Sequence, residues 1–163
     1  MSLEIVLNLS NIMNTDVADI KKLRDETGAG IADCKEALKF SKGDINKAKE
    51  WLRQHSVMIA LGKTSRPTGA GIVDTYIHHT LNSGATVVLG SETDFVARNG
   101  EFKEFAHDVA QQVVATGTQQ VEKLLQEPWI KDETRTIGDL LNEKIAKFKE
   151  NIAIQEVKKF EVK

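Results

Sequence analysis

The sequence predicts an α+β protein in which a helical bundle precedes a small antiparallel sheet with its own helices. Apolar residues recur every three or four positions over 15–56, which is the period of amphipathic helices. A stretch rich in glycine, proline and small polar residues follows, and we place a linker at 57–70. β-Branched runs and further helical stripes over 71–163 predict the mixed unit. Residues 1–14 precede the bundle as an N-terminal extension.

Three short helices are expected in the bundle. Their apolar stripes are Val17, Ile20 and Leu23; Ile31, Cys34, Ala37 and Leu38; and Ile45, Ala48, Trp51 and Leu52. Asp16 and Asp44 precede the first and third stripes and are suited to cap those helices. Gly28 and Gly30 lie so close together that they favour a tight turn between the first two helices.

The second part of the chain reads as a hairpin, two helices and a last strand. The expected strands cover 72–79, 85–89 and 152–162, and the expected helices carry Phe102 to Val113 and begin at Thr136. Gly117 is suited to end the first of these helices. Asp139, three residues after Thr136, predicts a capping box at the start of the second helix.

Composition argues against several partners. The chain has 22 Lys and Arg against 24 Asp and Glu, so it lacks the basic surplus that nucleic-acid binding usually needs. Its single cysteine, Cys34, is expected to be a small core residue, because it cannot form an internal disulfide or a cysteine-rich zinc site. No apolar run approaches the ~20 residues that span a bilayer. We therefore expect neither nucleic acid nor membrane as a partner, and a cytosolic or organellar-matrix location.

No enzyme constellation is found. His78 and His79 are adjacent on an expected strand, so their side chains should point to opposite faces and could not hold one metal ion. Glu92 and Asp94 lack a neighbouring base, nucleophile or metal box. No Gly-Lys-Ser/Thr ends a phosphate loop. We expect no catalytic residue, no metal, no cofactor and no nucleotide bound by this chain.

Two segments stand out from the background. Residues 23–38 read as helix, glycine turn and helix with a small-residue loop, which is either a binding loop or a plain structural turn. Residues 90–99 follow a strand, and Thr93 can cap a helical turn that presents Asp94 and Phe95 at the end of the sheet. An aromatic ring beside a carboxylate suits a protein-binding anchor, but a buried core position for Phe95 stays open from the residues alone.

These two segments resemble the elongation factor Ts family, the exchange factors for the GTPase elongation factor Tu. Residues 23–38 are similar to its N-terminal signature of Leu-Arg, two residues, Thr-Gly-x-Gly, an apolar residue and then Lys-x-Ala-Leu. Residues 93–96 match its Thr-Asp-Phe-Val signature. The similarity continues, in order, at 128–132, 140–147 and 150–152.

The resemblance implies a binding function rather than covalent chemistry. The bundle would be ubiquitin-associated-like and would dock on the nucleotide domain of elongation factor Tu through Leu23, Arg24, Thr27, Gly28 and Gly30. The exchange contact would be made by Thr93, Asp94, Phe95 and Val96. Phe95 would insert between side chains of two helices near the magnesium and phosphate site, so that GDP leaves. The location implied is bacterial cytoplasm, with a processed organellar protein as the alternative.

The resemblance also bears on assembly. The chain has room for one core copy and resembles the short members of the family, so we expect a homodimer or a two-plus-two complex with elongation factor Tu. It departs from the family's pattern at Ala70, Gly90 and Lys149, where Glu, Asn and Gly are usual, and at Gln155-Glu156, where a basic pair is usual. A competing interpretation is a ubiquitin-associated-like adaptor that binds a protein through the Gly28–Gly30 loop without exchange activity.

Overall fold

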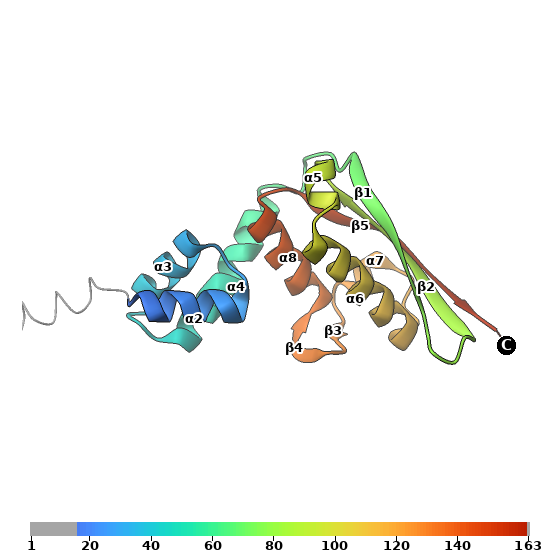
Figure 1. The fold of residues 1–163 in the computed structure, drawn as a ribbon, viewed down its shortest axis with the longest axis horizontal. Helices are drawn as coiled ribbons and strands as arrows, with labels where there is room; N and C mark the ends of the chain where they lie inside the picture. Colours follow the sequence, from blue (N-terminus) through green and yellow to red (C-terminus); the bar gives the residue numbers. More distant parts are fainter. Residues whose placement is uncertain (1–15, 163) are drawn as a thin grey trace, which may run out of the picture. The chain divides into compact units, whose positions relative to one another are not determined.

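The computed structural model describes residues 16–162, which fall into two compact units (Figure 1). The first unit extends to Met58 and the second begins at Ile59. Each has its own cluster of buried apolar side chains. The extension predicted at 1–14 lies outside the described residues. None of the helices in the described range is long and apolar enough to cross a membrane.

The first unit is the predicted bundle of helices α2 (Val17–Thr27), α3 (Ile31–Phe40) and α4 (Ile45–Leu61). The Asp16 carboxylate accepts the Ala18 N–H at 3.1 Å, and the Asp44 carboxylate accepts the amides of the first turn of α4, so both predicted caps are confirmed. Gly28 ends α2 in the left-handed conformation, with φ at 69°. The core of the unit consists of Leu23, Cys34, Ala37, Leu38, Ala48 and Leu52.

Three expectations for this unit were wrong. Val17 and Ile31 are 78% and 58% exposed, because each is the first residue of its helix and lies before the positions that pack in the core. Helix α4 continues to Leu61, so residues 57–61 of the expected linker are helical. No glycine or proline interrupts that helix before Gly62.

The second unit is built on a three-stranded antiparallel sheet of order β1–β2–β5. Its strands are β1 (Ala70–Ile77), β2 (Ser83–Ser91) and β5 (Ile152–Glu161). Helices α6 (Gly100–Thr116) and α8 (Ile137–Phe148) lie on one side of this sheet (Figure 1). Their shared core includes Val87, Leu89, Phe102, Phe105, Val109, Leu140, Ile145, Ile152 and Ile154. The α+β fold class predicted from the sequence is therefore confirmed.

Shorter elements complete the unit. They are α5 (Asp94–Ala97), α7 (Val121–Leu124), β3 (Pro128–Trp129) and β4 (Asp132–Thr136), and the last two strands pair with each other. Gly117 ends α6 in the left-handed conformation, as predicted. The capping box of Thr136 and Asp139 at the start of α8 is present with both of its hydrogen bonds.

The expectation for His78 and His79 was wrong. Strand β1 ends at Ile77, and the His78 N–H donates to the Ser83 carbonyl as the hairpin turns. Because the alternation of a strand no longer applies there, the two imidazole rings lie near each other, with centroids 4.1 Å apart.

Candidate functional site

The turn that follows β2 presents Phe95 to solvent. Its phenyl side chain is 91% exposed, and Asp94 beside it is exposed as well. Buried strand β2 carries the chain to the end of the sheet, where α5 makes a single helical turn. The interpretation of Phe95 as a core residue is therefore wrong, and the turn offers an aromatic ring next to a carboxylate.

The other side of this turn is fixed in the core. Val96 and Ala97 are buried and belong to the apolar cluster beneath the sheet. Consecutive positions of one helical turn point in different directions, so burying Val96 and Ala97 turns Asp94 and Phe95 outward. Val96 was predicted as a partner contact, but its buried side chain anchors the turn and does not form part of the exposed surface.

Thr93 does not cap its own helix through its side chain. It occupies the N-cap position of α5 with an extended backbone, yet it makes no side-chain capping hydrogen bond there. Its hydroxyl instead donates to Glu150 Oε1 at 2.7 Å, and its N–H donates to Glu150 Oε2 at 3.1 Å. The predicted cap was wrong, and both donors of Thr93 are instead bound by a carboxylate 57 residues further along the chain.

In the first unit, side chains hold the glycine turn closed. Thr27 Oγ1 donates to the Leu23 carbonyl at 2.7 Å and accepts the Ala29 N–H at 3.3 Å. Cys34 Sγ donates to the Ala29 carbonyl at 3.7 Å. The thiol of Cys34 is a buried core group, as predicted, and burial raises its pKa, which keeps it protonated.

The predicted docking residues of this unit divide into buried and exposed groups. Leu23 is fully buried in the core, where the apolar stripe of α2 faces the other helices, so its side chain is not part of the exposed surface. Arg24 and Gly30 are exposed, whereas Gly28 is half-buried and shapes the turn. Ile31, directly after Gly30, is an exposed apolar residue. The sequence pattern did not indicate it as a surface residue, because its spacing placed it in the apolar stripe of the second helix. The surface of this loop therefore centres on Gly30 and Ile31.

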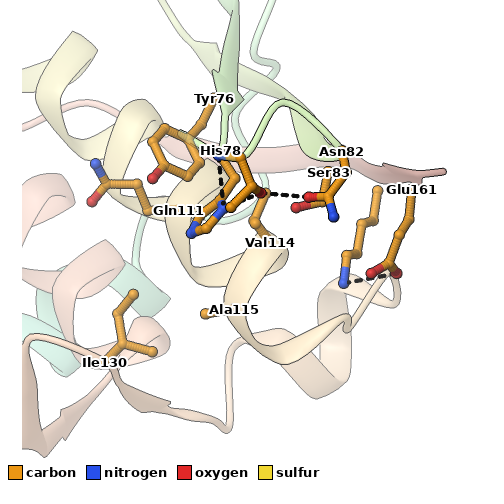
Figure 2. A pocket seen from close by; sticks show the side chains of 11 residues that line it. Tyr76, His78, Asn82, Ser83, Gln111, Val114, Ala115, Ile130 and Glu161 are labelled. Atoms are coloured by element: carbon orange, nitrogen blue, oxygen red, sulfur yellow. Dashed lines mark hydrogen bonds and ion pairs between the residues drawn. The ribbon is translucent and has the colours of Figure 1, made fainter.

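A hollow beside the β1–β2 turn is a further candidate site (Figure 2). It encloses about 590 Å³ and is lined by side chains that include Tyr76, His78, Gln111 and Ile130. Its polar groups largely bond to one another: His78 Nδ1 lies 2.7 Å from Thr80 Oγ1, and Lys159 pairs with Glu161. No group of three or more metal-ligating side chains occurs within residues 16–162.

The two exposed turns, one in each unit, are typical of the class of proteins that bind partners through surface loops. Sequence comparison gives this class a family. A profile described as "Elongation factor TS" matches residues 92–163, and one described as "Elongation factor Ts, mitochondrial, N-terminal" matches residues 5–59.

Curated relatives agree over most of the chain. Elongation factor Ts of Alkaliphilus metalliredigens is 35% identical, with 92% of this chain and 90% of the relative covered. Elongation factor Ts of Halothermothrix orenii is 36% identical, and that of Clostridium botulinum is 39% identical; they are covered over 50% and 47% of their own length. The chain thus spans about half the length of these last two. It belongs to the elongation factor Ts family.

Gly90 and Gln155 lie against each other in the structure. A Cβ atom at Gly90 would collide with the side-chain amide of Gln155, which donates to the Thr68 carbonyl at 3.2 Å. The glycine and the glutamine therefore fit as a pair. Lys149 ends α8 with φ at 58°, a left-handed conformation that favours glycine.

Proposed function

We propose that this chain is a guanine-nucleotide exchange factor for elongation factor Tu in translation elongation. The observation that carries the proposal is the exposure of Phe95, which lies inside the family's Thr-Asp-Phe-Val signature on a turn anchored in the core. A large exposed phenyl group is available for a partner's pocket, and buried aromatic anchors dominate binding energy at interfaces. Phe95 inserts beside the magnesium and phosphate site of the GTPase, and Asp94 makes charge-assisted hydrogen bonds there.

The exchange works as a coupling between two binding events. The chain weakens GDP binding by the same factor by which GDP weakens binding of the chain. Each ~1.4 kcal/mol of coupling changes the nucleotide affinity tenfold. The loop at Gly30 and Ile31 docks the first unit on the nucleotide domain and leaves the Phe95 turn to act on the nucleotide. No covalent step and no nucleotide bound by this chain are needed.

Fluorescent GDP preloaded on elongation factor Tu tests this function. Stopped-flow release is expected to accelerate with chain concentration and to saturate, since the ternary complex forms before GDP leaves. Excess GDP should weaken the affinity of this chain for elongation factor Tu by a certain factor. This chain should weaken the affinity of elongation factor Tu for GDP by the same factor. Release that is no faster at saturating chain contradicts the proposal. Tight binding without faster release would instead indicate the adaptor.

We also propose that two copies of the chain pair through the outer face of the sheet. Val73 and Ile77 on β1 and Phe160 on β5 are exposed, on the face away from Tyr76 and the helices. Ile77, Gly84 and Phe160 are in register across the three strands, so Ile77 and Phe160 lie on the same face. A twofold axis would match this apolar patch with itself.

The mass in solution tests the pairing. Light scattering at micromolar concentration is expected to give twice the 18.1 kDa chain mass. Ile77→Arg should return the monomer, because a charge would then face the partner's apolar patch. The matched variant Thr64→Arg, at an exposed position after α4, should stay dimeric. The measurement is repeated at about 100 µM, roughly 100 times a dissociation constant of about 1 µM. A wild-type chain that is still a monomer at that concentration contradicts the pairing.

The relatives also bear on location. Those named above come from bacteria, which supports bacterial cytoplasm as the place where this chain acts.

A further inference from the structure

We infer that Glu150 is a positioning residue for Phe95: from the segment that follows α8, its carboxylate holds Thr93, the N-cap residue of α5. The expected effect on GDP release rests on the proposed function, whereas the hydrogen bonds that support the inference lie within this chain and need no partner. Glu150 accepts both the N–H and the hydroxyl of Thr93, two residues before Phe95. Nothing in the Thr-Asp-Phe-Val signature itself indicates this link.

The capping box of α8 shows which hydrogen bond Glu150 provides at the start of α5. At the start of α8, Thr136 Oγ1 accepts the Asp139 N–H, and the Asp139 carboxylate accepts the Thr136 N–H at 3.0 Å. In α5 the residue equivalent to Asp139 is Val96, three positions after the N-cap residue. Val96 is needed in the core and has no acceptor. The Glu150 carboxylate takes the place of that missing acceptor for the Thr93 N–H.

The link is reciprocal, which fixes the two segments against each other. Glu150 accepts from the segment that begins α5, and Glu92 Oε1 accepts the Asn151 N–H from the segment after α8 at 2.5 Å. The Arg66 guanidinium lies 3.6 Å from Glu92 Oε1, and Asn151 Nδ2 donates to the Arg66 carbonyl at 2.6 Å. We call these four residues with Thr93 the clamp.

The length of α5 explains why a clamp is needed. A helix of four residues has about one turn, and forming the first turn is unfavourable without outside contacts. Val96 and Ala97 fix the far side of the turn, whereas the Thr93–Glu150 bonds fix its start. With both sides of the turn held, the backbone directs the Phe95 side chain outward before a partner arrives. Preorganisation of this kind removes an ordering cost from binding.

The test compares Glu150→Ala and Glu150→Gln with Asp139→Ala, which breaks the capping box of α8 away from the Phe95 turn. In the free chain, amide exchange at Thr93 should rise about tenfold in Glu150→Ala, the change that corresponds to losing a bond of ~1.4 kcal/mol. Glu150→Gln retains one acceptor oxygen and should show a smaller rise. Asp139→Ala should leave Thr93 exchange unchanged and raise exchange at Thr136, whose N–H loses the Asp139 carboxylate.

GDP release from elongation factor Tu then tests the consequence. Glu150→Ala should lower the maximal release rate about tenfold, with a smaller change in the concentration that gives half of it, because docking of the first unit is untouched. Adding Phe95→Ala to Glu150→Ala should give no further loss beyond Phe95→Ala alone. Asp139→Ala should keep the maximal rate of the wild type even if its melting temperature falls.

The outcomes separate the two proposals. Unchanged Thr93 exchange in Glu150→Ala overturns the clamp, whatever elongation factor Tu does. Raised exchange with an unchanged maximal release rate overturns the positioning role. If the wild type does not accelerate GDP release, the proposed function fails. In that case ¹⁵N relaxation of the free chain tests the clamp. Glu150→Ala should increase the backbone motion of residues 94–97, and unchanged motion rejects the clamp.

Discussion

Phe95→Ala is expected to slow GDP release from elongation factor Tu by roughly tenfold to a hundredfold at saturating chain, while the stability of the chain is unchanged. The factor corresponds to a loss of about 1.4–2.7 kcal/mol, the scale of an interface anchor. Stability should stay the same because the phenyl group is 91% exposed and removing it opens no cavity. Stopped-flow release and thermal melting measure the two quantities on the same samples.

Phe40→Ala is the matched control for this experiment. Phe40 is a phenylalanine of similar exposure at the end of α3, outside both signature segments. It should leave the maximal release rate at the wild-type value. If Phe95→Ala keeps the wild-type rate, Phe95 has no part in exchange. If Phe40→Ala slows release equally, the effect belongs to exposed aromatic residues in general.

Gln112→Leu is expected to destabilise the second unit by about 2–4 kcal/mol, the cost of leaving two or more polar groups without a partner. Gln112 is fully buried on α6, although leucine would fill much of its volume. Its Oε1 accepts the Ile130 N–H at 2.9 Å, and its Nε2 donates to the Pro128 carbonyl at 3.0 Å. These bonds tie the β3 segment to α6, and leucine offers neither a donor nor an acceptor.

Urea unfolding followed by tryptophan fluorescence measures this loss. The chain has two tryptophans, and in a Trp51→Phe background Trp129 alone reports on the second unit. Gln111→Leu, one position earlier on the same helix and only half-buried, is the control and should change stability by less than about 0.5 kcal/mol. Equal midpoints for the Gln112 and Gln111 variants would show that the buried amide contributes no stability.

The sequence predicted the elements of both units well because their signals are local. Helix starts at Asp16, Asp44 and Thr136 depend on a side chain reaching an amide two or three residues away, and all were confirmed. The ends of α2 and α6 depend on glycine adopting a positive φ. Periodicity then placed the strands and helices between these signals.

Local patterns were insufficient where burial depends on contacts between distant segments. Val17 and Ile31 fit their apolar stripes in spacing, yet each lies outside the packed turns of the bundle. Leu23 and Val96 belong to the signature segments, but their side chains fill the two cores. A motif marks which residues go together, whereas only packing decides which of them a partner can reach.

By itself the sequence determined the fold class, the order of the main helices and of the strands of the larger sheet, and the segment that carries Phe95, but not α7, β3 and β4. The tertiary structure decided that Phe95 is exposed, and that Thr93 is held by Glu150 across 57 residues instead of capping its own helix. The physical reason is the sequence separation over which each interaction acts. Backbone hydrogen bonds and apolar periodicity act within a few residues and can be read along the chain. The orientation of a short turn depends on side chains that only the folded sheet and helices bring together.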